Sequence, residues 1–259
     1  MAVNYFDIAS YWAPREESPE ELGGRTLRCL DAISALSPIF RDWKFIDLFR
    51  DPDEMTEKNI DEFLYPLVEV RSRITEVVER GISDNGVGEP DSRVGYSISV
   101  SNYGVPKSQH VTLSAHGGGL PSWAGLPRNA CFRTSYGADP DPAIVAYPMF
   151  KSILLAIMSS WDVDYAKAYS RDLSELSTDS RPFGRLSWMV YLSAPLVRRI
   201  EIPTDVLIER TRDGGLLMIA AEETFDVANP AHIAAARSIV AALEPLNIEL
   251  TKNHAKFET

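Results

Sequence analysis

The sequence predicts an α+β protein in which one or more largely antiparallel sheets pack against helices. The segments run strand, helix, helix and strands, then helix, strands and helix, so the strands cluster in runs. Short turns separate most neighbouring strand segments, and such turns join antiparallel strands. The helical segments carry apolar residues at helical spacing on one side.

The first third of the chain predicts one strand and two helices. The segment Val3–Tyr11 mixes β-branched, aromatic and polar residues, as strands do. Ser18 followed by Pro19 and two glutamates is a helix start, and this first helix is expected to reach about Leu36. A second helix is expected over about 56–80, where apolar residues form one stripe and Gly81 follows.

The middle of the chain predicts three strands. The first alternates between Tyr96, Ile98 and Val100 on one side and serines on the other. A glycine-rich loop over 117–127 is expected between the second and third. The three strands are expected at Val94–Tyr103, His110–Ala115 and Ala130–Ser135.

The C-terminal part predicts helices at both ends and strands between them. The helix Pro142–Ser160 is apolar nearly all round and should lie centrally. A hairpin is expected across residues 212–215, where Asp-Gly and Gly-Gly favour a tight turn. The strands are expected at Tyr165–Arg171, Leu186–Ser193, Val206–Thr211 and Leu216–Ala221, followed by a helix from Pro230 to Leu243 with Asn229 as its cap.

Two related halves are suggested by a Tyr-Pro pair in each of the two long middle helices. The pairs are Tyr65-Pro66 and Tyr147-Pro148. No long linker interrupts the chain, so residues 1–259 are expected to form a single domain.

The charge balance argues against nucleic acid as a partner. The net charge is −11, from 26 basic and 37 acidic residues, whereas nucleic-acid binding favours a basic surface. Residues 1–91 carry 20 acidic and 10 basic side chains, and residues 92–259 carry 17 and 16. A negative field concentrated in the first third can steer a basic partner towards the protein, although solubility explains most acidic residues equally well.

The sequence also indicates a reducing compartment and no membrane segment. Only Cys29 and Cys131 are present, and they lie far apart. The N-terminus has no basic region followed by an apolar stretch, as a secretory signal would. The most apolar run, Ile144–Trp161, contains Pro148 and Lys151 and is expected to be a buried helix. We therefore expect a cytoplasmic protein.

The search for catalytic, metal or cofactor motifs yields none that is complete. The run from His116 to Gly119 resembles an esterase oxyanion loop, but no Gly-x-Ser-x-Gly pentapeptide accompanies it. No two histidines have metal-ligand spacing, and no phosphate-binding loop is present. We expect no catalytic residue, metal or cofactor. The alternative is an unrecognised hydrolase or metal-dependent enzyme in which Asp139 and Asp141 act with His110 or His116. A third hypothesis is a structural adaptor of a secretion machine.

Several segments resemble one known family in their order along the chain. Near the N-terminus, Tyr11-Trp12, Arg15 and Glu17-Ser18 precede a capped helix, which Phe40 and Trp43 follow. Residues 184–193 carry Gly, Ser-Trp and Tyr-Leu-Ser, and a hairpin from Gly214-Gly215 to Phe225 precedes the last helix. Together these residues resemble the immunity protein 52 family, whose aromatic and glycine positions are expected to be mostly structural.

This resemblance implies a bacterial antidote to a polymorphic or type VI secretion toxin. Such antidotes are encoded beside their toxin and bind it in the cytoplasm, and they are not enzymes. The implied partner is a toxin protein, a nuclease with the restriction-endonuclease fold. Our interpretation places contacts on the acidic turn and the start of the second expected helix, with one aromatic anchor in the glycine-rich loop. These candidate residues are Asp51, Asp53, Glu54, Glu57, Asp61, Glu62 and Trp123.

Overall fold

The described strands form one ten-stranded sheet in which every neighbouring pair is antiparallel. The strand order is β3-β2-β4-β5-β6-β1-β7-β8-β10-β9. The α+β prediction is therefore confirmed. The computed structural model describes residues 3–13, 15, 17–46, 64–66, 96–118, 129–135, 137–179 and 181–254.

The elements follow the predicted order closely, with several short additions. The strands are β1 (Phe6–Tyr11), β2 (Lys44–Ile46), β3 (Leu64–Pro66), β4 (Tyr96–Ser101), β5 (Val111–Gly117), β6 (Asn129–Thr134), β7 (Tyr165–Ser170), β8 (Met189–Leu192), β9 (Leu207–Arg210) and β10 (Leu216–Ile219). The helices are α1 (Pro19–Ser34), the short 3₁₀ helix η3 (Lys107–Gln109), α4 (Pro142–Val145), α5 (Tyr147–Trp161), α6 (Arg171–Glu175), α7 (Ala194–Val197) and α8 (Pro230–His254).

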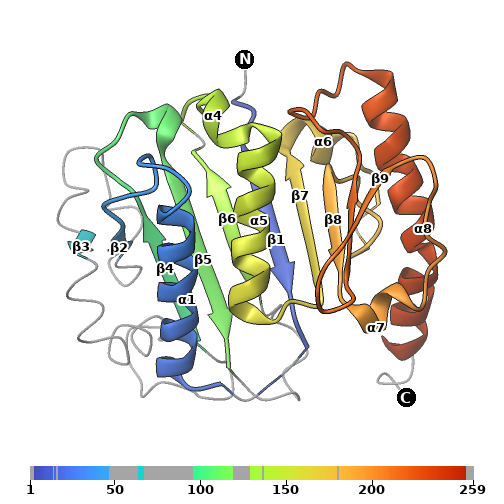
Figure 1. Ribbon diagram of the computed structural model, residues 1–259, viewed down its shortest axis with the longest axis horizontal. Helices are drawn as coiled ribbons and strands as arrows, with labels where there is room; N and C mark the ends of the chain where they lie inside the picture. Colours follow the sequence, from blue (N-terminus) through green and yellow to red (C-terminus); the bar gives the residue numbers. More distant parts are fainter. Residues whose placement is uncertain are drawn as a thin grey trace.

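Helices cover the two faces of the sheet unequally. In Figure 1, α1 and α5 lie side by side across one face, and α8 stands beside the β8 to β10 end. Phe6 and Ile8 of β1 enter the core beneath α5, together with Phe150. Val190 of β8 and Met218 of β10 instead join Ile239 of α8 in a second cluster. Strands β8 and β10 are thus buried on both faces, which explains why their sequences are apolar without alternation.

The start of α1 is fixed by local sequence, as predicted. Ser18 Oγ accepts a hydrogen bond from the Glu21 N–H, and Glu21 Oε2 accepts one from the Ser18 N–H. These reciprocal bonds satisfy two backbone donors that a helix start leaves open. The helix then buries Leu22, Cys29, Leu30 and Ile33 against the sheet.

Two of the predicted helices differ in the structure. The helix expected over Pro142–Ser160 is divided into α4 and α5, because Ala146 is extended and Pro148 has no N–H to donate to Ile144. The helix expected over 56–80 is wrong at Leu64–Pro66, which forms β3; the rest of that range lies outside the described residues. Tyr65-Pro66 is therefore in a strand and Tyr147-Pro148 in a helix, so the pair does not support two related halves.

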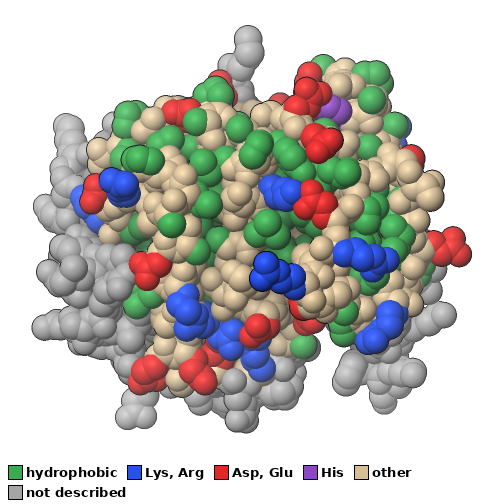
Figure 2. Space-filling model, in the orientation of Figure 1, with side chains coloured by type: hydrophobic (Ala, Val, Ile, Leu, Met, Phe, Trp, Pro, Cys, Tyr) green, Lys and Arg blue, Asp and Glu red, His purple; other side chains and the backbone are tan. Residues whose placement is uncertain are grey.

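The described part of the helix-bearing face carries charges of both signs. Figure 2 shows basic and acidic side chains interspersed between apolar patches on the described part of this face. One such pair is Lys151 of α5 and Glu209 of β9, which form an ion pair at 2.5 Å. Among the described residues, no helix combines the length and apolar character needed to cross a membrane.

Candidate functional site

A pocket of about 530 Å³ opens on the face of the sheet opposite α1 and α5. Its floor comes from the end of β1 and from β7, and its walls come from residues 181–185 and from α7. The volume is within the range of roughly 300–1,000 Å³ that is usual for ligand sites. The lining residues are Tyr11, Trp12, Ala13, Asp164, Tyr165, Lys167, Tyr169, Arg181, Pro182, Phe183, Arg185 and Leu196.

Strand alternation places three tyrosines in this pocket. In the register of β1 and β7, Tyr11 lies opposite Tyr165, and their rings stack with centroids 5.7 Å apart. The Tyr165 ring also contacts Phe183 at 4.5 Å, and its hydroxyl donates to the Pro182 carbonyl at 3.3 Å. Burial raises the pKa of Tyr11, Tyr165 and Tyr169, so their hydroxyls stay protonated at neutral pH.

Lys167 lies among these rings and is only 5% exposed. Its neighbours across the strands are Ala9 on β1 and Val190 on β8, and its ammonium lies over the Tyr169 ring at 5.4 Å. Burial and, to a smaller extent, the positive charge of Arg185 together lower the pKa of Lys167 to about 8. Within the described part of the chain, no carboxylate forms an ion pair with Lys167.

The two arginines of the pocket differ in their partners. Arg181 forms hydrogen bonds to Asp179 and to Glu244 of α8, so its charge is compensated at the rim. Arg185 is exposed, and no described carboxylate pairs with it. The pocket therefore carries positive charge at the end formed by Lys167 and Arg185.

The opposite end of the pocket is formed by Asp164, which precedes β7. Asp164 accepts a hydrogen bond from the Ala13 N–H at 2.8 Å and one from the Ser193 hydroxyl at 3.3 Å. Both contacts tie the end of β1 to the strands beside it. The Asp164 carboxylate is thus engaged by the protein itself, which leaves the cationic end as the part able to recognise a charged group.

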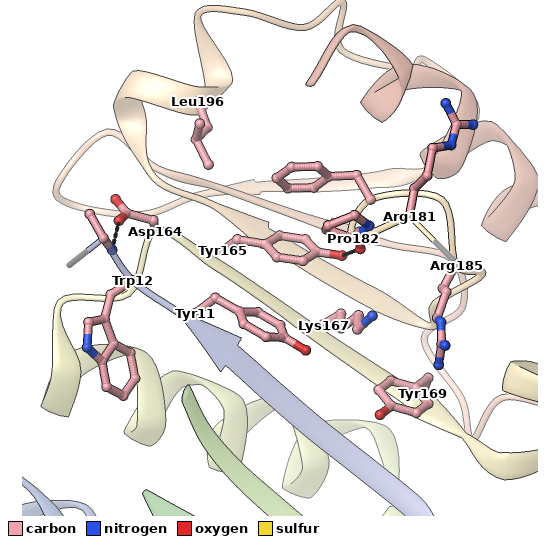
Figure 3. A pocket seen from close by; sticks show the side chains of 12 residues that line it. Tyr11, Trp12, Asp164, Tyr165, Lys167, Tyr169, Arg181, Pro182, Arg185 and Leu196 are labelled. Carbon is pink, nitrogen blue, oxygen red and sulfur yellow. Dashed lines mark hydrogen bonds between the residues drawn. The ribbon is translucent and has the colours of Figure 1, made fainter. Parts of the chain in front are cut away.

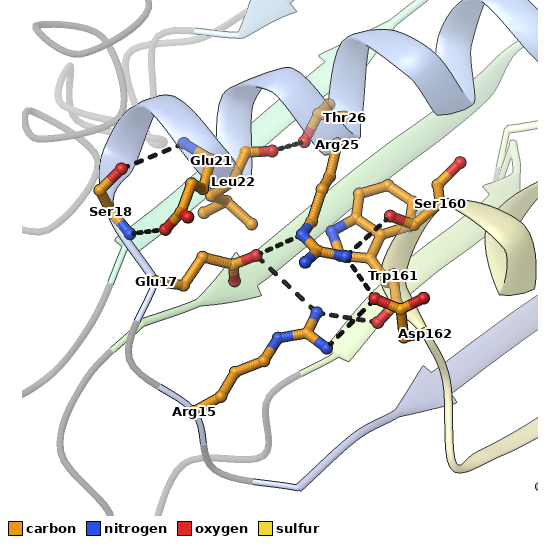
Figure 4. Close-up of polar contacts among 10 residues, drawn as sticks. All are labelled: Arg15, Glu17, Ser18, Glu21, Leu22, Arg25, Thr26, Ser160, Trp161 and Asp162. Carbon is orange, nitrogen blue, oxygen red and sulfur yellow. Dashed lines mark hydrogen bonds and ion pairs between the residues drawn. The ribbon is translucent and has the colours of Figure 1, made fainter.

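A polar network holds the β1–α1 connection against the end of α5, next to this pocket (Figure 4). Glu17 is buried, and its Oε1 lies 2.8 Å from Arg25 Nε and 3.8 Å from Arg15 Nη2. Arg15 also donates to the Trp161 carbonyl, and Arg25 reaches Asp162 at 2.9 Å. These bonds connect the chain after Trp12 to the helix that follows the central strands.

Burial dominates the electrostatics of this network. It raises the pKa of Glu17 even though Arg15 and Arg25 act in the other direction. It also lowers the pKa of Arg15. Because burial disfavours the charged forms of both groups, the ion pairs by themselves do not stabilise the folded protein. We infer that the network holds the start of α1 and the end of α5 in one arrangement next to the pocket.

The candidate contact residues named from the sequence all lie outside the described residues. They are Asp51, Asp53, Glu54, Glu57, Asp61, Glu62 and Trp123, so the acidic contact surface and the aromatic anchor stay predictions.

Four aromatic residues that carry the family resemblance are buried in the core, as expected of structural residues, whereas Tyr11 lines the pocket. Trp12, Trp43 and Trp188 are at most 6% exposed, and Phe40 is fully buried. The indole N–H of Trp43 donates to Ser34, and that of Trp188 donates to the Ala221 carbonyl.

Two glycines of the same motifs are required by close packing. A Cβ at Gly184 would lie 2.2 Å from the Asp179 carboxylate, and one at Gly215 would lie 2.6 Å from the Tyr191 ring. Neither distance leaves room for a side chain, so larger residues at these positions would force their neighbours to move.

The two histidines of the alternative enzyme reading lie at opposite ends of one strand, so at most one of them can act with Asp139 and Asp141. His110 precedes β5 and His116 is near its other end, so about 20 Å of extended strand separates them. Asp141 accepts from Gln109 beside His110, but it also caps α4 through the Ala143 N–H. In the ranges that the structure describes, no group of three or more His, Cys, Asp or Glu side chains is placed to hold a metal.

Sequence reasoning missed the pocket, although part of its signal was present. The segment Tyr165–Ser170 alternates bulky residues with alanines, and the one lysine falls between two tyrosines on the bulky side. A lysine in that pattern indicates a cation held among aromatic rings. Arg185 and Phe183 could not be assigned to the same place, because their position depends on how the loop folds over the strand.

Comparison with known proteins finds a family model and a solved structure that this chain resembles. Residues 121–248 match the family model described as immunity protein 52. The chain also matches a solved structure, the Pseudomonas aeruginosa T6SS protein PA0821, with 10% identity and a TM-score of 0.46 over 92% of this chain and 73% of that one. No curated protein matches it in sequence. The predicted resemblance is therefore confirmed: over residues 121–248, this chain matches the immunity protein 52 family.

Proposed function

We propose that this chain is an immunity protein that binds and neutralises a cognate secreted bacterial toxin. The observation that carries the proposal is the match of residues 121–248 to the immunity protein 52 family. Most residues that line the pocket around Lys167 described above, here called the Lys167 pocket, lie within that segment. Its tyrosines and arginines are residue types that often dominate protein interfaces. The protein acts by binding, in the bacterial cytoplasm, and not by catalysis.

The proposed toxin is a nuclease with the restriction-endonuclease fold. A nuclease must hold phosphates, so its nucleic-acid surface is expected to be basic. The acidic excess of residues 1–91 suits such a surface, and electrostatic steering can raise association rates by roughly 10–10³. The expected contacts are the acidic residues between Asp51 and Glu62, together with Trp123.

Co-expression with the toxin encoded beside this chain tests the proposal. We expect the two proteins to co-purify and this chain to restore growth of cells that make the toxin. Failure of both would reject the immunity role. Measurable nuclease activity of the toxin on DNA or RNA, lost when this chain is added, would support the nuclease assignment, whereas a toxin with another activity would reject that assignment alone.

The acidic contact surface is tested separately by charge reversal. The double variant Asp51→Lys and Asp53→Lys should slow association with the toxin and reduce its salt dependence. Its matched control is Glu201→Lys with Glu222→Lys, because both control positions are exposed and the change in net charge is the same. Equal slowing by the two variants would indicate an effect of net charge and would place the interface elsewhere.

A further inference from the structure

The Lys167 ammonium is buried, and no described residue supplies a counter-charge for it. It is 5% exposed, it lies over the Tyr169 ring, and the charge that acts on it from the described residues is the like charge of Arg185. A buried charge is costly unless it is paired, and buried lysines are therefore rare in proteins. Because no described residue pairs with it, the buried ammonium is available to bind an anion that a partner supplies.

The groups around Lys167 are arranged to receive one anionic group. Arg185 supplies a second cation beside it (Figure 3), and the hydroxyls of Tyr11 and Tyr169 are protonated donors. The Asp7 carboxylate also acts on both hydroxyls and raises their pKa, but its own charge is paired with Arg133. Arg181 does not compete, because Asp179 and Glu244 already occupy its guanidinium. Charge-assisted hydrogen bonds from such donors are roughly twice as strong as neutral ones.

The pocket walls favour a carboxylate on an aliphatic stem over a phosphate. The stacked rings of Tyr11 and Tyr165, with Phe183 against them, provide an apolar wall beside the cationic end. Phosphate sites usually use backbone N–H groups at a helix start or a glycine-rich loop. The described lining residues donate through side chains instead. The volume of about 530 Å³ accommodates a short stretch of chain around the acidic side chain.

We propose that the Lys167 pocket binds a glutamate or aspartate side chain presented by the partner toxin, with Lys167 and Arg185 as its cationic contacts. This inference rests on the proposed function, because it names the partner by that function. It adds a cationic contact on the sheet face to the acidic contacts proposed for residues 51–62. The two surfaces together would match a toxin that carries both basic and acidic patches.

The test compares affinities of the purified chain and its variants for the purified toxin. Lys167→Met removes the charge and keeps an unbranched side chain, and it should weaken binding by roughly 30-fold or more, mainly through faster dissociation. Arg185→Gln should weaken binding by a smaller factor. Its control is Arg28→Gln, an exposed arginine on α1 at the opposite face, which should change affinity less than about twofold. Unchanged affinity of Lys167→Met would overturn the proposal.

Proton uptake on toxin binding distinguishes a direct contact of Lys167 with the toxin from a purely structural role of this residue. A carboxylate beside Lys167 favours its protonated form, whereas the free protein holds a pKa of about 8 there. Calorimetry at pH 8.5 in two buffers of different ionisation enthalpy should show uptake of roughly half a proton or more on toxin binding. The uptake should disappear in Lys167→Met. Equal uptake by both proteins would count against the pocket.

The pocket can also be tested without the toxin. Glutarate and inorganic phosphate are titrated into the wild-type protein and Lys167→Met, and backbone NMR shifts are followed. Saturable shifts around β7 with glutarate, absent in the variant, would support the pocket even if the toxin does not bind and the immunity role fails. Shifts with phosphate but not with glutarate would overturn the carboxylate assignment. If the toxin does not bind and glutarate causes no shifts, the proposal is also overturned.

Discussion

Replacing Lys167 by methionine should make this protein more stable while weakening its proposed interaction. In the folded protein, the pKa of Lys167 falls from 10.5 to about 8, which corresponds to roughly 3 kcal/mol of unfavourable free energy at neutral pH. Methionine removes that penalty, and it also removes the contact of the ammonium with the Tyr169 ring, worth about 1 kcal/mol. The expected net gain at pH 7 is about 2 kcal/mol.

The pH dependence follows from the direction of the shift. Between pH 8 and 10.5 the unfolded chain holds the Lys167 proton more strongly than the folded protein, so the penalty is full below pH 8 and fades as the pH rises. The contribution should fall from about 3 kcal/mol at pH 7 to between about 1 and 2 kcal/mol at pH 9.5. Urea denaturation of both proteins at these two pH values measures the difference between their free energies of unfolding. The contributions of other ionisable groups cancel in this difference.

Two results would refute this reasoning. One is a Lys167→Met variant that is less stable than the wild type at pH 7, because the ammonium would then be a net stabilising contact. The other is a stability difference that does not change between pH 7 and 9.5, because the lysine would then titrate alike in both states. Lys167→Arg serves as a control, since it keeps the charge and should not gain stability.

Three further changes test the packing directly. Ser18→Ala removes the cap of α1 and should lower the free energy of unfolding by about 1 kcal/mol in urea denaturation; no loss would contradict the capping role. Gly215→Ala should destabilise by roughly 1–3 kcal/mol, because its methyl group would meet the Tyr191 ring. Gly24→Ala, in a helix with space around it, should stabilise by roughly 0.5–1 kcal/mol, and equal effects of the two would refute the packing argument. Burial raises the pKa of the Cys29 and Cys131 thiols to about 12, so both should resist a thiol reagent at pH 8 until urea unfolds the protein; rapid labelling of the native protein would contradict this.

Local patterns were sufficient where the structure is decided by neighbouring residues. Ser18 and Glu21 cap a helix through bonds three residues apart, and the turn at Asp213-Gly214 closes the hairpin of β9 and β10 as predicted. The alternation from Tyr96 to Ser101 likewise predicts β4. The α+β class, the strand order along the chain and the family resemblance all rest on signals of this local kind.

Patterns of the same kind failed where a proline or a neighbouring strand decides the outcome. Pro148 divides the helix expected over Pro142–Ser160, and pairing with β2 holds Leu64–Pro66 in a strand despite the helical spacing around it. Conversely, α8 continues past Pro245 to His254, beyond the end expected at Leu243.

The sequence by itself determined the class of fold, most of its elements and the resemblance to an antidote family, because capping, alternation and motif order act over short distances. Only the tertiary structure decided that Lys167 is buried with no counter-charge among the described residues. That property depends on β1 pairing with β7, on the loop that carries Phe183 and Arg185, and on which charges lie nearby. These residues are up to about 170 positions apart, so no local pattern could bring them together.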